Sequence, residues 1–378
     1  MRYNLSDIMF YKVTHCADQD GMKTLIAAVS FITFIMCCPA YGQGDQFLQQ
    51  HEERRLEMPQ DISCELRLAS KTHSFHQGEM IPIELGISSS TPDRYEHDGA
   101  DYDRSGRLSI DSFVVDRKSD AVDPLDDYFN RGYALFQSGG LRYFGALVQQ
   151  PYISYYDVNE WLQFDKPGKY RLFISSGRVS VGERTGQEHK GFPVISNIIE
   201  FEIAPADENW SQTKLKTLER SLDSPLSAKD HKAACRELRF LTTELAAKEI
   251  IRRFTGQDEV CQFEFFMALQ GSPHRKLVID EMTLAMNKSD FPVTRDFVED
   301  LWLLSYFYQT AGSFKKDLGG AAGNDDADWD TIFDLKGKQI ESEKVANNLE
   351  AALKNKTGQA LAISTATLNY IRKLDKDR

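Results

Sequence analysis

The fold is decided where residues 198–205 read IIEFEIAP. Apolar and polar side chains alternate up to Ile203, which is the period of a half-buried β-strand, and Pro205 then ends the pattern. Before this segment the chain alternates in the same way over several short stretches. After it, from Ser227 onward, apolar residues recur at the 3.6-residue spacing of a helix. The sequence therefore predicts two parts, a β-rich one followed by an α-helical one.

Short alternating segments define the first part. Residues 62–68 and 81–87 each place their apolar side chains on one face, and further strands are expected at 108–115, 170–175 and 197–203. Loops rich in Gly, Asp, Pro and Ser lie between them. Short strands joined by such turns, without a helical pattern, predict an antiparallel β-sandwich over residues 61–205.

Two turn motifs in this part resemble known bacterial domains. Residues 165–172 read DKPGKYRL, which is similar to the PGxY strand entry of immunoglobulin-like and macroglobulin-like bacterial domains. Residues 75–83, FHQGEMIPI, resemble another element of the same domains. The resemblance implies an immunoglobulin-like fold and no activity.

Helix signals follow. Ser227 and Asp230 have the spacing of a capping box, and Gly256 is expected to end the helix that they begin. The stripe expected on this helix consists of Cys235, Leu238, Thr242 and Leu245. Further helices are expected over residues 258–270, after Ser272-Pro273 as N-cap and first helical position, and after Thr294 as N-cap. Linkers of two to five residues require successive helices to pack antiparallel.

The segment SDFPV at residues 289–293, together with Phe297 and Val298, resembles the turn and second helix of HEAT-type repeats. This resemblance implies that residues 211–312 form a short HEAT-like helical stack. Residues 313–330 are interpreted as a Gly/Asp-rich linker, and residues 331–378 as a tail of one or two helices broken near Gly358.

The N-terminus carries the pattern of an export signal. Lys23 precedes an uncharged, mostly apolar run over residues 24–38, and Ala40 and Gly42 form a small-x-small exit. A spanning helix needs about 20 apolar residues, so a cleaved signal is favoured over a retained anchor or a buried core helix.

We therefore expect translation to start at Met22 and cleavage to follow Gly42. Residues 1–42 are then a signal segment and residues 43–60 an N-terminal linker. The mature protein is expected to be periplasmic or secreted, without a membrane span. Its net charge of −12 argues against nucleic acid and anionic membrane surfaces as partners, because both require clustered Lys and Arg.

Three cysteines lie beyond the signal segment. Cys235 and Cys261 fall on neighbouring predicted helices, and an oxidising compartment would allow them to form a disulfide. The alternative is two separately buried thiols. Cys64 is interpreted as a buried free thiol in a strand.

Residues 101–112, DYDRSGRLSIDS, resemble a calcium loop of the EF-hand or dockerin type. Asp101, Asp103 and Ser105 would supply oxygen ligands at positions 1, 3 and 5, with glycine at position 6. Position 12 is serine, and Asp111 stands one place before it, so Asp111 is the fourth candidate ligand. Calcium is the one cofactor that this resemblance implies, and a solvated acidic hairpin is the alternative.

The sequence contains no nucleophile elbow, phosphate-binding loop, HExxH helix or paired CxxC, so no catalytic residue is assigned. The leading hypothesis is an exported non-catalytic binding or scaffold protein that contacts a protein partner in the cell envelope. Peptidase inhibition is a narrower version of it. The whole chain resembles exported bacterial proteins that join a β-sandwich to helical repeats, a group that offers no functional residues to match.

The alternative hypothesis is an envelope hydrolase. Its acids would come from residues 93–127 and its sugar-stacking surface from the aromatic-rich residues 128–161. This hypothesis requires two buried, adjacent carboxylates, and the candidates are Asp111, Asp123, Asp126 and Asp127. Acids in an Asp-rich loop are usually solvated, so the binding hypothesis ranks first.

Overall fold

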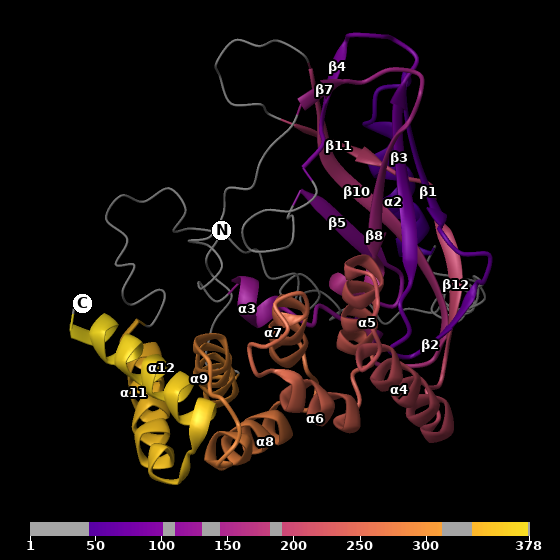
Figure 1. The fold of residues 1–378 in the computed structure, drawn as a ribbon. Helices are drawn as coiled ribbons and strands as arrows, with labels where there is room; N and C mark the ends of the chain where they lie inside the picture. Colours follow the sequence, from indigo (N-terminus) through magenta and orange to yellow (C-terminus); the bar gives the residue numbers. More distant parts are fainter. Residues whose placement is uncertain (1–44, 101–109, 131–143, 182–190, 312–334, 377–378) are drawn as a thin grey trace, which may run out of the picture. The chain divides into compact units, whose positions relative to one another are not determined.

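The computed structural model describes residues 45–100, 110–130, 144–181, 191–311 and 335–376. The chain divides into two units, residues 1–53 and residues 54–378. In the first unit, the described residues belong almost entirely to helix α2 (Gln46–Leu56), which occupies the segment interpreted above as a linker. The second unit contains β-sheets followed by helices, as the change of period at residues 198–205 predicts (Figure 1).

The β part contains two large sheets. The first has the antiparallel order β1–β3–β8, formed by Ile62–Leu68, Pro82–Ser89 and Tyr152–Asp157. The second has the order β2–β12–β10–β4–β7, and β5 and β11 also pair with the long strand β10. Its strands are β2 (Ser74–His76), β4 (Tyr95–Asp98), β5 (Asp111–Val115), β7 (Phe144–Ala146), β10 (Gly168–Val181), β11 (Phe192–Ile195) and β12 (Ile199–Ala204).

Small elements complete the β part. Strands β6 (Ala121–Val122) and β9 (Gln163–Phe164) form a separate two-stranded ladder. The short helices are η1 (Lys118–Asp120), α3 (Asp126–Asn130) and η3 (Val158–Glu160).

The expectation of a purely antiparallel arrangement is wrong for one pair, because β2 runs parallel to β12. The turn after β2, with Gly78 at a φ of 82°, sends the chain directly into β3 of the other sheet. Since β2 forms no hairpin with the strand that follows it, its three residues add to the edge of β12 instead.

Side chains from both sheets form one hydrophobic core. Leu66, Leu85, Leu172 and Phe201 belong to it, and all are almost completely buried. Cys64 also lies in this core as a free thiol, and burial raises its pKa to about 12. It therefore behaves as a small apolar side chain.

Helices make up most of the described residues after β12. They are α4 (Glu208–Leu222), α5 (Ala228–Phe240), α6 (Glu244–Arg253), α7 (Gln262–Gln270), α8 (Arg275–Asn287), α9 (Arg295–Gln309), α11 (Leu335–Ala352), η5 (Leu353–Asn355) and α12 (Gly358–Lys376). The predicted N-caps Ser227 and Thr294 are confirmed, since each side chain accepts a backbone hydrogen bond from the first turn of its helix. In the described part of the tail, α11 and η5 are followed by α12, which begins at Gly358, so the helical segment is broken where the sequence predicts.

The single helix predicted between Ser227 and Gly256 is in fact two helices. Thr242 adopts a positive φ of 43°, and Thr243 then caps α6 by accepting a hydrogen bond from the Ala246 amide. The chain therefore changes direction within the predicted apolar stripe. Leu245, the last member of that stripe, is half exposed as a result.

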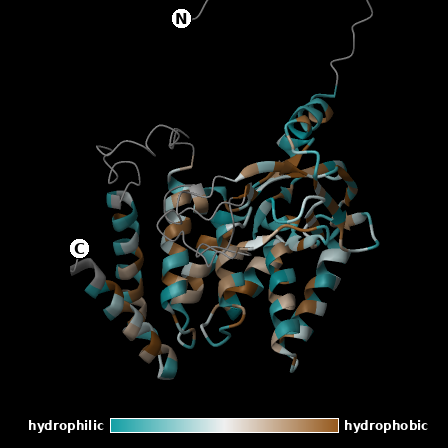
Figure 2. Cartoon of the chain, turned by 90° about the horizontal axis from the view of Figure 1, so that it is seen from above, coloured by the Kyte–Doolittle hydropathy of each residue, from teal (hydrophilic) through white to brown (hydrophobic). Residues whose placement is uncertain are grey.

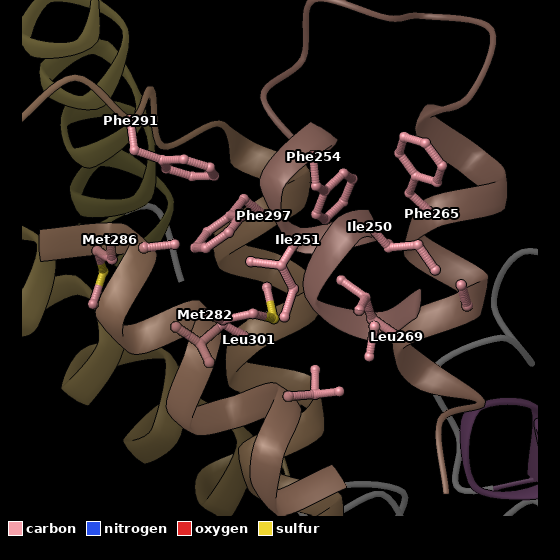
Figure 3. Close-up of a cluster of buried hydrophobic side chains, with 14 of the residues drawn as sticks. Ile250, Ile251, Phe254, Phe265, Leu269, Met282, Met286, Phe291, Phe297 and Leu301 are labelled. Carbon is pink, nitrogen blue, oxygen red and sulfur yellow. The ribbon is translucent and has the colours of Figure 1, made fainter. Parts of the chain in front are cut away.

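The helices share a second core, shown in Figure 3. Phe254 and Phe297 lie with their ring centroids 6.0 Å apart, next to Ile251 and Leu301. The hydropathy colouring in Figure 2 shows hydrophilic and hydrophobic residues on the same helices, the pattern of helices that bury one face. None of the helices described here combines the length and apolar character needed to cross a bilayer.

Candidate functional site

An open groove of about 610 Å³ lies on the helical part. It is bounded by the start of α6, the start of α8 and the end of α9. The residues that line it are Glu244, Pro273, His274, Arg275, Lys276, Leu277, Asp280, Glu281 and Tyr308. Both signs of charge and three apolar side chains are therefore present in one concave surface.

The chain segments around this groove are held by specific contacts. Ser272 and Pro273 do not begin α8 as predicted, because the Ser272 hydroxyl accepts the His274 amide in a preceding turn and the helix starts at Arg275. His274 Nε2 lies 3.2 Å from the carbonyl oxygen of Thr242, at the break between α5 and α6. Arg275 pairs with Asp127, which belongs to α3. These contacts thus hold in place the turn before α8, whose residues Pro273 and His274 line the groove.

Most charged groups of the groove have partners within it or beside it. Lys276 Nζ lies 2.6 Å from an oxygen of Asp280, and this hydrogen bond raises the pKa of Lys276. Glu281 lies 3.2 Å from Lys248. Tyr308 remains 46% exposed at the end of α9. A paired polar rim beside an accessible aromatic ring is suited to binding another surface.

The structure describes one of the four predicted calcium ligands, Asp111. Asp101, Asp103 and Ser105 lie outside the described residues. Asp111 lies on β5 and is buried, with Oδ2 accepting hydrogen bonds from Arg178 Nε at 3.0 Å and from the Tyr156 hydroxyl at 2.8 Å. Asp111 is therefore paired with the guanidinium group of Arg178.

Arg178 is the centre of this buried polar cluster. It is only 1% exposed, and its Nη1 also donates to the carbonyl oxygens of Asp98 and Ala100 at 2.9 and 2.6 Å. These bonds tie β10 to the end of β4 and to β5. These hydrogen bonds and the Asp111 carboxylate offset the cost of burying the Arg178 charge, which would be large for an unpaired cation.

The four acids that the hydrolase hypothesis depends on are not buried together. Asp111 is the one buried member, whereas Asp123, Asp126 and Asp127 are partly exposed. Asp123 accepts the Leu125 amide at 3.0 Å, and Asp127 pairs with Arg275. No two of these carboxylates form the adjacent buried pair that the hypothesis requires.

His97 lies on β4 beside the cluster, 2% exposed, with its ring 3.7 Å from that of Tyr152. Burial and the nearby Arg178 guanidinium lower the pKa of His97 to about 4. Because the unfolded chain binds a proton near pH 6.5 and the folded protein does not, stability is full above that pH and falls as the pH drops toward 4. Between pH 7 and pH 4.5 we therefore expect the free energy of unfolding of His97→Gln to fall by about 2 kcal/mol less than that of wild type.

The measurement is urea unfolding of wild type and His97→Gln at pH 7 and at pH 4.5. His73→Gln, a change at an exposed histidine, is the control and should keep the wild-type pH dependence. An equally steep loss in His97→Gln and wild type would contradict a neutral, buried His97.

The two cysteines expected to pair are joined as a disulfide, with Cα atoms 5.5 Å apart. Cys235 lies on α5 and Cys261 immediately precedes α7. Two more donors lie beside them, since one ligand atom each of His231, Cys235, Asp258 and Cys261 all fall within 4.8 Å of one another. His231 Nε2 and Asp258 Oδ2 are 2.6 Å apart.

His231 and Asp258 are not among the site residues predicted from the sequence. Their spacing was a usable signal, because His231 precedes Cys235 by four residues and Asp258 precedes Cys261 by three. Within a helix or tight turn, both spacings place side chains on one face. The sequence does not show that the pair His231–Cys235 meets the pair Asp258–Cys261, because the two cysteines are 26 residues apart in the chain.

Buried ion pairs connect the β part to the helices. Arg239 on α5 donates to Glu160 of η3 at 2.7 Å and to Glu264 of α7 at 2.9 Å, and all three side chains are at most 6% exposed. Arg236 lies 3.0 Å from Glu160 and also pairs with Asp157 of β8. A cavity of about 30 Å³ lies at the same junction, with room for about one water molecule.

Comparison of the chain with family models, with curated proteins and with solved structures gives no match.

Proposed function

We propose that the protein is an exported, non-catalytic binding protein that holds a protein partner in the groove between α6, α8 and α9. The observation that carries this proposal is the half-exposed Tyr308 ring in a groove of about 610 Å³. Aromatic side chains surrounded by polar contacts are enriched among the residues that dominate binding energy. The groove is open and lined by charged residues, whereas small-molecule sites are usually more enclosed and apolar.

Helix packing supports a HEAT-like stack as the framework. Helix α5 contacts α7, α6 contacts α8, and α7 contacts α9, so three successive helices pack on the helix two places ahead. Repeats of helix pairs stack in this way and use their extended surfaces for binding. The shared core of the two large sheets supports the immunoglobulin-like sandwich in the same manner.

Export rests on residues 22–42, whose basic start, apolar run and small-residue exit are typical of a cleaved signal. The proposed location of the partner is therefore the cell envelope or the medium. N-terminal sequencing of the protein recovered from its own cells should begin at Gln43. Recovery of an uncleaved chain from the cell interior would contradict this part of the proposal.

The binding test is affinity capture from the envelope fraction with the full mature chain as bait, followed by measurement of the affinity for the captured protein. Tyr308→Ala is expected to weaken binding about 30-fold, the cost of losing one dominant contact of about 2 kcal/mol. Because Tyr308 is half exposed, the substitution should leave the free energy of unfolding nearly unchanged.

Tyr155→Ala is the matched control. Tyr155 lies on β8 and is 72% exposed, so the same side chain is removed from the β part. If Tyr155→Ala weakens binding and Tyr308→Ala does not, the partner binds the sheet and the groove proposal is wrong.

A further inference from the structure

Four side chains with metal-binding atoms meet at one place between α5 and α7. His231 and Cys235 are four residues apart on α5, on the same helix face. Asp258 and Cys261 are held by a tight turn, in which the Cys261 amide donates to both the carbonyl oxygen and Oδ1 of Asp258 at 3.2 Å. All four ligand atoms fall within 4.8 Å of one another.

The donor set matches what zinc prefers. Zn²⁺ in proteins is held tetrahedrally by thiolate sulfur, imidazole nitrogen and carboxylate oxygen. Bonds of 2.0–2.3 Å place the four donors of such a site roughly 3.3–3.8 Å apart. Donors that lie within 4.8 Å of one another can reach this spacing by shifts of about 1 Å, once the sulfur–sulfur bond is broken and the two sulfur atoms move apart. Two thiolates, one carboxylate and one neutral imidazole also supply more than enough negative charge for a divalent cation.

The exposure of the four side chains favours a closed metal site that an ion can enter from one side. Both cysteines are fully buried, whereas the side chains of His231 and Asp258 are 20% and 30% exposed. The sulfur atoms therefore lie inside the helical core, and the imidazole and carboxylate lie where solvent reaches them. An ion can approach through the His231–Asp258 side, and the cysteines complete its coordination.

We propose that these four residues form a redox-controlled zinc site, which binds one Zn²⁺ when the cysteines are reduced and is closed when they form the disulfide. This site is independent of the proposed binding groove. In the oxidised form the sulfur–sulfur bond removes both thiolates, and the His231–Asp258 hydrogen bond occupies the remaining donors.

The change between the two forms is a balanced reaction. A thiol reductant supplies two electrons and two protons, becomes a disulfide itself, and leaves Cys235 and Cys261 as thiols. Zn²⁺ then displaces both protons to solvent as two zinc–sulfur bonds form. His231 binds through Nε2 with its proton on Nδ1, and Asp258 binds through an oxygen.

The test is titration of the full mature protein with Co²⁺, which reports tetrahedral thiolate coordination by its visible absorption. After reduction with a phosphine under anaerobic conditions, we expect one equivalent of Co²⁺ to bind and one equivalent of Zn²⁺ to displace it. The oxidised protein should show no such absorption. His231→Ala and Asp258→Ala keep both cysteines and are each expected to weaken binding at least about 100-fold.

Cys64→Ala and His73→Ala are the controls, because both residues lie outside the cluster, and neither change should alter the titration. Should the reduced protein lose its circular dichroism signal, one equivalent of Zn²⁺ is expected to restore it, as in other structural zinc sites. The proposal is overturned if the reduced protein binds no cobalt and zinc restores no structure. It is equally overturned if His231→Ala and Asp258→Ala bind the metal as wild type does.

Discussion

Replacing Arg178 with methionine is expected to lower the free energy of unfolding by about 3–5 kcal/mol. The guanidinium of Arg178 is buried and pairs with the equally buried carboxylate of Asp111 at 3.0 Å. Methionine fills much of the same volume but leaves the buried Asp111 charge without its cation, with the Tyr156 hydroxyl still donating to it. Removing one partner of a buried pair costs far more than the pair itself contributes. Urea unfolding at neutral pH measures the loss.

Two further variants make this prediction specific. Arg171→Met removes an arginine from the same strand. The ion pair between Arg171 and Asp116 is partly exposed, so the free energy of unfolding should fall by at most about 1 kcal/mol. The double variant Arg178→Met/Asp111→Leu removes both charges and should recover much of the stability that Arg178→Met loses. Equal losses in Arg178→Met and Arg171→Met would show that the burial of the pair has no energetic consequence.

The second large effect is expected from Arg239→Met. Arg239 and Arg236 both pair with Glu160 of η3 and Glu264 of α7, so the loss of Arg239 removes one of two arginines beside these buried acids. The Arg236–Glu264 distance of 3.4 Å is longer than the 2.9 Å contact that is lost. We expect about 3 kcal/mol of destabilisation, together with faster hydrogen exchange in η3 and α7.

Arg252→Met is the comparison for Arg239→Met, since the Arg252 side chain is 61% exposed, and its partner Glu249 also pairs with Arg253. It should cost at most about 1 kcal/mol and leave exchange in η3 unchanged. An Arg239→Met protein with wild-type stability and exchange would mean that the ion pairs do not connect the sheets to the helices.

Local sequence patterns were sufficient for much of the fold. The alternation in residues 62–68 corresponds to strand β1, and the hydroxyl side chains of Ser227 and Thr294 begin helices where capping chemistry predicts. These features depend on neighbours within a few residues. The helix break at Thr242 was missed because the apolar stripe continues across it, and a positive φ at threonine has no sequence signature.

Contacts between distant segments could not be predicted in the same way. Asp111 was interpreted as a calcium ligand from its local spacing, but its partner Arg178 lies 67 residues further along the chain. The groove has a similar origin, since its residues come from three helices and from the turn before α8, which the sequence does not place side by side. The cysteine pair was accessible to sequence reasoning because Cys235 and Cys261 fall on neighbouring predicted helices, whereas His231 and Asp258 are ordinary polar residues until the helices pack.

Site-specific photocrosslinking in the cells that produce the protein tests directly whether the groove between α6, α8 and α9 holds a protein partner. A photoreactive amino acid is placed at position 308 in the groove and, in a second variant, at position 155 on β8. If the partner binds in the groove, position 308 crosslinks to one envelope protein and position 155 does not. A crosslink to that protein from position 155 and none from position 308 would contradict it.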